Sequence, residues 1–395
     1  MVEAGLHEKQ RAGGHVGTFV GGSVAGFALS WNLTNTGAIA PVLARHYDVG
    51  LVTVGLLTSI AFLAEFAIMI PGGRAIDRWG ARRVAIVSLM LCLLGNALLL
   101  ALPGIYAALF LRWLLGFGVG AGFVAGSIWI TEDPRGRSAL GQGLFGGVSL
   151  AGAGIALAVV PALKSTLRWQ SSYWTGLIVA AAALALAFVS VGAVREAGDH
   201  QTTPMRHLIQ HPLIARLGAI HSASFAFSVI AGNWVVTLLT RHLGLSYGRA
   251  GLVGGLTLVL GIVGRPLGGW AVRRFPERTY AVIVSSLALG GFAMLALALS
   301  RSLALDTLAA AILGLASGMP FGACVNAAAR TFPRTPGEAV GAMNLYAVTA
   351  IIVGTPLVGA TFSLPGAGRI GFATLAVLTV AAITSVPRTR FHGRS

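Results

Sequence analysis

Apolar stretches of roughly 20 residues recur along the whole chain, separated by short polar segments. As a helix, each stretch is long enough to cross the ~30 Å hydrocarbon core of a bilayer. The pattern predicts twelve spanning helices, and the short connections make consecutive helices antiparallel neighbours. We expect the spans at about 15–43, 51–72, 84–104, 107–130, 140–163, 172–194, 213–240, 250–271, 280–299, 306–328, 339–362 and 370–387.

The composition agrees with a membrane protein. Of the 395 residues, 55% are hydrophobic and 10% are charged, and the mean hydropathy is +0.80. Soluble globular proteins carry about 25% charged residues, so this chain could not cover a water-facing surface. The first apolar segment is too long for the core of a cleavable signal peptide, and we interpret it as the first spanning helix.

The net charge of +16 is explained by topology and does not indicate a nucleic-acid partner. When the 28 Lys and Arg are sorted by alternate loops, nineteen fall on one side, seven on the other and two inside helices. Cytoplasmic loops carry the excess of positive charge. We therefore expect a multi-pass protein of a bacterial-type inner membrane, with both termini cytoplasmic and basic loops in contact with anionic lipid.

The chain contains an internal repeat. Its longest polar stretch, 195–211, lies at the middle and predicts a cytoplasmic linker, 198–212, between halves 1–197 and 213–395. Adding 196 maps Arg45 and His46 onto Arg241 and His242, and the same offset maps Gly72, Gly73, Ala75 and Arg78 onto Gly268, Gly269, Ala271 and Arg274. Both halves start on the same side, as in transporters built from parallel repeats. The expected fold is an all-α membrane protein with two pseudo-symmetric six-helix bundles.

The connection between the second and third predicted helices carries a recognisable motif. It reads Gly73-Arg-Ala-Ile-Asp77-Arg78-Trp-Gly80-Ala-Arg82-Arg83 and resembles the signature loop of the major facilitator superfamily. Glycines let two helices approach closely, and an aspartate can pair with an arginine on another helix of the same half. The resemblance implies a conformational latch formed by Gly73, Asp77, Arg78, Gly80 and Arg82. The alternative is a cytoplasmic turn made basic by topology. In the second copy Arg273 replaces the aspartate, which puts a latch there in doubt.

Two ionisable residues inside helices are candidates for proton coupling. The segment Arg112-Trp-Leu-Leu-Gly116-Phe-Gly118 resembles a superfamily pattern associated with proton coupling. An unpaired arginine there costs at least ~2.5 kcal/mol, so a structural role with bonds to backbone carbonyls is the alternative. Glu65 lies mid-span in the second helix, where an isolated carboxylate binds a proton readily. Its alternative is a neutral, hydrogen-bonded structural side chain.

Arg265 is the main candidate for substrate binding. Gly264-Arg265-Pro266-Leu267-Gly268-Gly269 resembles an element of nitrate/nitrite and cyanate-type porters, in which the arginine binds the anion. Its planar donors suit a carboxylate or an oxyanion. Nitrate porters have a matching arginine in the second helix, where this chain has Met69, and Ser149 stands in place of their helix-5 asparagine. We therefore expect a small organic anion rather than nitrate. Arg265 could instead form a buried ion pair with Glu65, and we hypothesise that an anion competes for it.

Other polar or aromatic residues in the predicted helices could line a central cavity, and each could equally bridge two helices. These residues are Asn32, Asn35, Trp129, His221, Asn233, Trp234, Asn344 and Tyr346.

The favoured function is secondary active transport of a small, anionic solute by alternating access, with the proton as the expected coupling ion and a monomer as the expected state. The alternative is a multidrug/proton exporter, although residues 147–154 lack the proline of that branch's motif. A membrane enzyme or receptor is disfavoured, because no catalytic spacing or nucleotide-binding loop occurs. Cys92 and Cys324 fit small core residues, and we expect neither a metal nor a cofactor.

Overall fold

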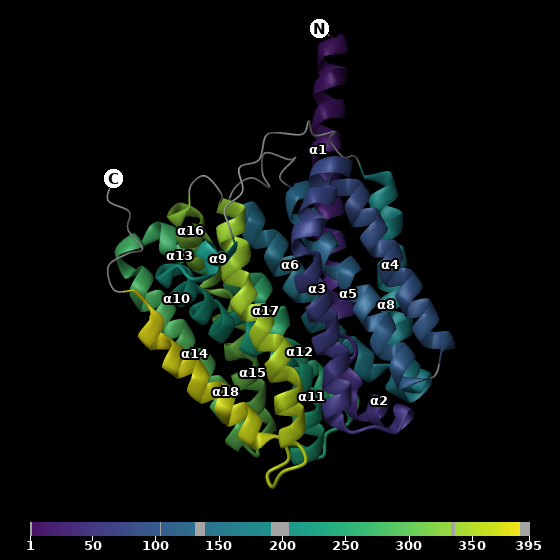
Figure 1. Cartoon of the computed structure of the whole chain (residues 1–395), viewed down its shortest axis with the longest axis vertical. Helices are drawn as coiled ribbons and strands as arrows, with labels where there is room; N and C mark the ends of the chain where they lie inside the picture. Colours follow the sequence, from purple (N-terminus) through teal and green to yellow (C-terminus); the bar gives the residue numbers. More distant parts are fainter. Residues whose placement is uncertain (1, 103, 131–138, 191–204, 333–335, 388–395) are drawn as a thin grey trace.

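The computed structural model describes residues 2–102, 104–130, 139–190, 205–332 and 336–387, and these ranges are helical with no strand (Figure 1). The first half contains α1 (Val2–Thr34), η1 (Gly37–Ile39), α2 (Ala40–Tyr47), α3 (Leu51–Trp79), α4 (Ala81–Ala101), α5 (Ile105–Trp129), α6 (Ala139–Ala162), α7 (Lys164–Leu167), η3 (Arg168–Gln170) and α8 (Ser171–Val189). The second half contains α9 (Met205–Ile209), α10 (Pro212–His221), the π-helical η4 (Ser222–Ala226), α11 (Phe227–Leu243), α12 (Tyr247–Val259), α13 (Gly261–Arg274), η5 (Pro276–Arg278), α14 (Thr279–Leu299), α15 (Leu303–Gly318), α16 (Phe321–Thr331), α17 (Pro336–Thr361), α18 (Arg369–Ala381) and η6 (Ala382–Ser385).

The helices match the predicted spans. Ten stretches within the described residues, from Leu51–Ile68 to Glu338–Thr361, are long and apolar enough to cross a membrane. The α1–α2 segment and α18 run beside them, so each of the twelve predicted spans has a helical counterpart (Figure 1). Large apolar side chains such as Ile178 and Phe292 are 59% and 65% exposed on the outside. A surface of this kind suits lipid rather than water.

The helix boundaries follow the repeat found in the sequence. The first spanning segment ends at Tyr47 and its counterpart ends at Leu243, and both residues are followed by helices that begin at Leu51 and Tyr247. Each pair differs by 196 positions.

The histidine of the repeated Arg-His pair contacts the same connection in both halves. The His46 ring stacks on Trp169, before α8, with centroids 3.8 Å apart. Nε2 of His242 lies 3.1 Å from the carbonyl oxygens of Gly366 and Ala367, before α18. The pair therefore holds the last connection of each half against the end of its first spanning segment.

The predicted linker, 198–212, is described only from residue 205 onward. That part contains α9, whose Leu208 is fully buried in the core of the second half. Tyr346 donates a hydrogen bond from its hydroxyl to the carbonyl of Ile209, at 2.8 Å. Residues 205–209 thus pack as part of the second half.

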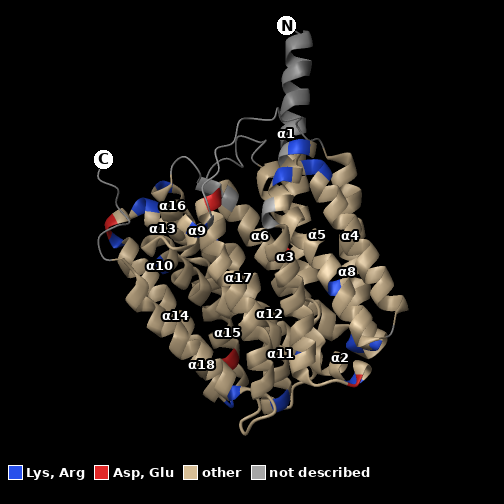
Figure 2. Cartoon of the chain, viewed as in Figure 1, with Lys and Arg blue, Asp and Glu red and all other residues tan. Residues whose placement is uncertain are grey.

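Charged residues gather at the two ends of the helices (Figure 2). We call the end where α3 passes into α4, with Arg78 and Arg82, the basic end. The end that carries α2 and residues 362–368 is called the far end. The basic end is the one that the distribution of Lys and Arg predicts to be cytoplasmic.

The two halves meet along two seams, α6 with α12 and α13, and α3 with α17. Gly154 and Gly255 lie on facing sides of the first seam, and a Cβ on either would clash with the backbone opposite. At the far end, Thr58 donates to Oδ1 of Asn233 at 2.8 Å. The ring of Trp234 packs against Gly55 of α3, and its indole N–H donates within the second half to the carbonyl of Thr355 at 2.9 Å. Small residues and cross-helix hydrogen bonds are how membrane helices associate without a hydrophobic driving force.

The buried core is shared at one end and divided at the other. One apolar cluster contains far-end residues from both halves, including Tyr47 and Leu239. Toward the basic end there are two separate clusters, one around Trp129 in the first half and one around Cys324 in the second. The apolar core is therefore continuous between the halves at the far end, whereas toward the basic end the two cores are separate and α6 still packs on α13 near Gly143 and Pro266.

Candidate substrate site between the halves

Arg265 lies on α13, at the seam with the first half. Its neighbours Gly264 and Gly268 have no room for a Cβ against the backbone of Leu315 and Met319, so α13 sits directly on α15 and the residues that follow it. The side chain extends to α6, where a Cβ on Gly146 would clash with Nη1 of Arg265. Close helix packing thus places one cation between the halves, 6% exposed.

The guanidinium of Arg265 lies among aromatic rings. Its Cζ is 4.2 Å from the ring centroid of Phe321 and 5.5 Å from that of Phe225. Among the described residues it has no hydrogen bond or ion pair, and its Nε is buried without an acceptor. Ring faces attract a cation but do not satisfy its N–H groups. The site therefore has unused donors suited to an anion.

His221 and Asn344 belong to the same cluster. The His221 ring stacks on Phe225, with centroids 5.2 Å apart and planes 12° from parallel. The Phe321 ring lies 5.9 Å away. Nε2 of His221 lies 3.1 Å from Oδ1 of Asn344. The structure thus brings together Arg265, His221 and Asn344 from three helices.

Phe225 and Phe321 were not predicted from the sequence. Phe225 lies four residues after His221, a spacing that puts both on one helix face and could have identified it. Phe321 follows the break between α15 and α16, at Pro320, and only the fold brings it near Arg265.

Glu65 is not part of this cluster. It faces α5, where a Cβ on Gly120 would touch its Cα and Cγ. Its Oε2 is buried without a hydrogen-bond partner. The hypothetical ion pair with Arg265 is absent from this conformation: within the described ranges neither residue takes part in an ion pair. Glu65 packs inside the first half, whereas Arg265 lies on the second and points to α6.

Arg112 is fully buried and saturated with backbone carbonyls. Its Nε donates to Leu57 at 3.1 Å and its Nη2 to Leu33 at 2.9 Å. Its Nη1 donates to the carbonyl of Asn32 and, at 3.4 Å, to Oδ1 of Asn35. Helix α1 ends at Thr34, so its last carbonyls lack helical partners. Arg112 caps this helix end, which corresponds to the structural alternative.

Asn32 and Asn35 lie inside the first half, away from the seam. Nδ2 of Asn35 donates to the carbonyl of Ser172 at 3.0 Å, and Nδ2 of Asn32 to that of Gly176 at 3.3 Å. Asn96 donates to Oδ1 of Asn32 at 2.6 Å. Both asparagines are 0% exposed and tie α1 to α8.

The remaining predicted cavity residues lie elsewhere. Trp129 is buried in the first half, where it packs against Gly21. Asn233 and Trp234 belong to the contact between the halves at the far end, and Tyr346 packs on Gly218 near α9. None of these four side chains is brought to Arg265.

The predicted latch loop is described in part. Gly80 has a φ of +85° between α3 and α4, a conformation that favours glycine. Arg82 donates to the carbonyls of Ala187 and Phe188, at 3.1 and 2.8 Å, and so ties the loop to the end of α8. Arg78 is exposed, and a Cβ added to Gly73 would meet open space. The side chain of Asp77 lies outside the described residues.

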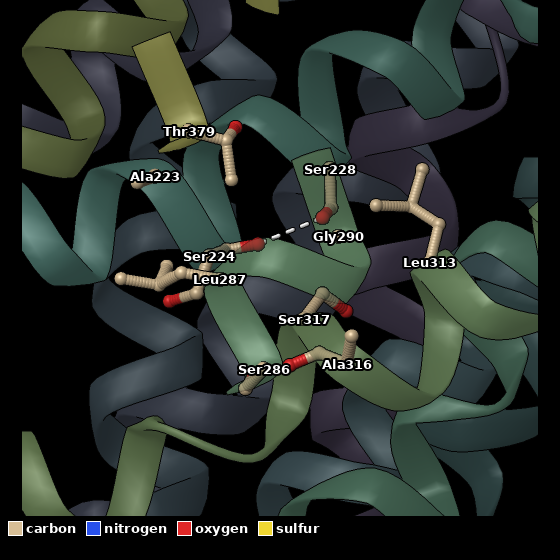
Figure 3. A pocket seen from close by; sticks show the side chains of 10 residues that line it. All are labelled: Ala223, Ser224, Ser228, Ser286, Leu287, Gly290, Leu313, Ala316, Ser317 and Thr379. Atoms are coloured by element: carbon tan, nitrogen blue, oxygen red, sulfur yellow. Dashed lines mark hydrogen bonds between the residues drawn. The ribbon is translucent and has the colours of Figure 1, made fainter. Parts of the chain in front are cut away.

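A small cavity lies inside the second half, near η4 (Figure 3). Its volume is about 10 Å³, room for one water molecule. Its hydroxyl groups bond to backbone carbonyls, as Ser286 does to Ala316 at 2.6 Å and Ser317 to Gly314 at 3.1 Å. It is too small for a substrate, so the seam around Arg265 is the better candidate.

The sequence matches the family model of the Major Facilitator Superfamily over residues 22–355 and 216–391. The chain belongs to the Major Facilitator Superfamily. It is thus a multi-pass membrane transporter and not an enzyme, and the assignment made from the signature loop is confirmed.

Relatives within the superfamily are named for small anions. The chain is 29% identical over 286 residues to a probable nitrate/nitrite transporter, NarK2, of Mycobacterium tuberculosis, with 68% of each chain covered. It is 24% identical over 370 residues to the nitrite extrusion protein of Bacillus subtilis, with 92% of this chain and 91% of the relative covered.

Solved structures show the same superfamily fold at low identity. The human organic anion transporter MFSD10 has a TM-score of 0.68 and 17% identity, with 94% of this chain and 99% of that chain covered. The nucleoside transporter NupG has a TM-score of 0.74 and 12% identity, with 93% and 98% covered.

Proposed function

We propose that this Major Facilitator Superfamily member is a proton-coupled secondary active transporter that carries a small anion across the inner membrane by alternating access. The observation that supports it is Arg265, a buried cation at the seam between the halves with no acidic partner among the described residues. An arginine held in this way would be costly in a purely structural role, because its N–H groups are desolvated without acceptors.

The geometry favours a monovalent anion with a planar acceptor group. A guanidinium presents parallel N–H donors that match a carboxylate or an oxyanion. The sequence has Met69 where nitrate porters have a second arginine, so Arg265 is the one permanent positive charge that would face the ligand. The relatives named for nitrate and nitrite support the anionic class. The missing second arginine favours a small carboxylate over nitrate.

Alternating access requires contacts that can form and break at each end. The bond between Thr58 and Asn233 joins the halves at the far end, whereas the apolar core is divided toward the basic end. This conformation fits a site that faces the basic end. By the positive-inside bias that end, with both termini, is cytoplasmic. Glu65 is a half-buried carboxylate whose Oε2 is buried without a hydrogen-bond partner, which makes it one candidate for proton uptake.

Ligand-induced stabilisation of the purified protein tests the anion site, because a bound ligand raises the apparent stability by mass action. Nitrate, nitrite, formate and acetate would be titrated against the wild type and against Arg265→Lys. Losing the bidentate donors removes about 1.5–3 kcal/mol, a loss of roughly tenfold to a hundredfold in affinity. Arg273→Lys, a change at an exposed position on the same helix, is the matched control and should leave the affinity unaltered.

Two results would contradict the proposal. Equal affinities of wild type and Arg265→Lys would mean that Arg265 does not bind the anion. Stabilisation by bulky cations instead of by any of these anions would favour a multidrug exporter.

A further inference from the structure

One ring nitrogen of His221 is unused. The ring is 2% exposed, and its Nε2 is occupied by Asn344. Its Nδ1 is buried and has no hydrogen-bond partner within the described residues. Buried imidazoles normally satisfy both nitrogens, so an unpartnered one in a candidate site points to a ligand.

The free nitrogen belongs to the same aromatic pair as the free guanidinium. Phe225 contacts both groups, with its ring centroid 5.2 Å from that of His221 and 5.5 Å from Cζ of Arg265. Phe321 contacts both as well, at 5.9 and 4.2 Å. The π-helical η4 begins directly after His221, and such irregular turns often mark functional sites. His221 and Arg265 therefore pack on the same two aromatic rings.

The protonation state of His221 decides what it offers there. With Nε2–H donated to Oδ1 of Asn344, a neutral ring presents a lone pair at Nδ1, which cannot bond to an anion. A protonated ring keeps the bond to Asn344 and presents Nδ1–H, a charged donor. His221 would then supply the second positive group that the sequence lacks at Met69.

We propose that His221 carries the transported proton: its protonated ring donates Nδ1–H to the anion held by Arg265, so anion and proton bind together. This rests on the proposed function and assigns its coupling residue. The ligand class is a monovalent oxyanion or carboxylate together with one proton.

The charges around His221 make the two binding events depend on each other. Among the described residues, Arg265 from α13 is the charged group that acts on the ring. Asn344, Phe225 and Phe321 contribute neutral side chains from α17, η4 and α16. In the empty site two cations would repel each other, and an anion between them reverses that effect. Reciprocal coupling follows, since each ligand raises the affinity for the other by the same factor. Glu65 packs against Gly120 of α5 and, among the described residues, has no hydrogen bond or ion pair with either group.

The experiment measures anion binding and proton uptake on the purified protein. Nitrate, nitrite and formate would be titrated from about pH 5 to 9, the range that brackets imidazole titration. Proton uptake would be followed with an indicator in weakly buffered solution. The wild type should take up one proton per anion, and its affinity should fall about tenfold per pH unit once the ring is neutral.

Three variants separate the possibilities. His221→Gln should bind the anion more weakly, with no proton uptake and no pH dependence. His207→Gln, at an exposed position on α9, is the matched control and should behave as the wild type. Glu65→Gln should keep the uptake of one proton per anion.

Asn344→Asp provides a test that retains the imidazole. A carboxylate at Nε2 favours the protonated ring, so anion binding should persist to higher pH, an effect that a structural role of His221 would not produce. Proton uptake or an unchanged pH profile in His221→Gln would overturn the assignment while leaving the Arg265 anion site intact. If no anion shows Arg265-dependent binding to the wild type, the proposed function fails, and this inference fails with it.

Discussion

At the scale of single residues, the two arginines inside the helices differ in how their charge is satisfied. Arg112 donates to three backbone carbonyls and an amide oxygen, whereas Arg265 has ring faces and unused donors. A buried group that is fully bonded contributes to stability, and one that is left unbonded points to a ligand. Hydrogen-bond saturation thus separates a structural arginine from a candidate ligand-binding one here.

This contrast predicts opposite effects of the same substitution. Arg112→Lys removes the fork that reaches carbonyls on both α1 and α3, so the free energy of unfolding should fall by about 2 kcal/mol. Arg265→Lys should leave stability almost unchanged without ligand and should lose anion binding. Thermal unfolding in detergent, with and without formate, would measure both. If Arg112→Lys were as stable as the wild type but had lost proton coupling, Arg112 would be a coupling residue and not a structural one.

The sequence was sufficient to select Arg265, His221 and Asn344, since each is a polar residue in an apolar helix. It could not give the rotation of each helix about its axis. By the repeat, Glu65 lies one turn from the position equivalent to Arg265. The face of α3 that carries Glu65 packs against glycines of α5 and not against the second half. Asn32 and Asn35 were cavity candidates because they are polar residues in an apolar helix, with bridging between helices as the alternative. The end of α1 at Thr34 turns them instead toward Arg112 and α8.

At the scale of elements, irregular turns accompany the candidate site. His221 directly precedes the π-helical η4, Phe321 directly follows the break between α15 and α16, and Arg265 follows the break at Leu260 between α12 and α13. The local sequence contains Pro320 and Pro266, which disfavour regular helix. The predicted spans were correct in length, but the breaks inside them could not be placed because neighbouring helices re-satisfy the backbone.

The contact between α3 and α11 yields a prediction about gating. Thr58→Val keeps the shape of the side chain and removes its bond to Asn233, which joins the halves at the far end. The far-end-closed state should lose about 1 kcal/mol, a shift of roughly fivefold in population. Labelling of Val54→Cys, a far-end position that is 2% exposed, would report the shift, because both native cysteines are buried.

A matched control is Thr349→Val, which removes a hydroxyl bonded only within its own helix, to the carbonyl of Leu345 at 2.8 Å. Its labelling rate at position 54 should equal that of the parent. An equal rate in Thr58→Val would mean that the hydrogen bond does not stabilise far-end closure.

At the scale of the whole molecule, the two halves share helix boundaries but differ at the seam. The offset of 196 relates the ends of their first spanning segments and the starts of the next, and the Arg-His pair occupies the same place in both. The permanent cation at the seam, however, belongs to the second half alone. In the proposed function, duplication supplies the scaffold for alternating access, and substitution within one copy supplies the candidate binding site.

The latch loop gives the last prediction, which concerns the balance between the two ends. By resemblance to the superfamily signature, Asp77 holds the basic end closed when the far end is open. Asp77→Asn should therefore favour the far-end-closed state and slow the labelling of Val54→Cys, with little change in anion affinity, because the loop is remote from Arg265. Asp48→Asn is the control, since Asp48 is exposed at a φ of +53° that asparagine also tolerates. Thr58→Val acts on the opposite end of the same equilibrium, so the double variant should label at close to the parental rate. Unchanged labelling in Asp77→Asn with a collapse of anion binding would mean that Asp77 acts on the site and not on the conformation.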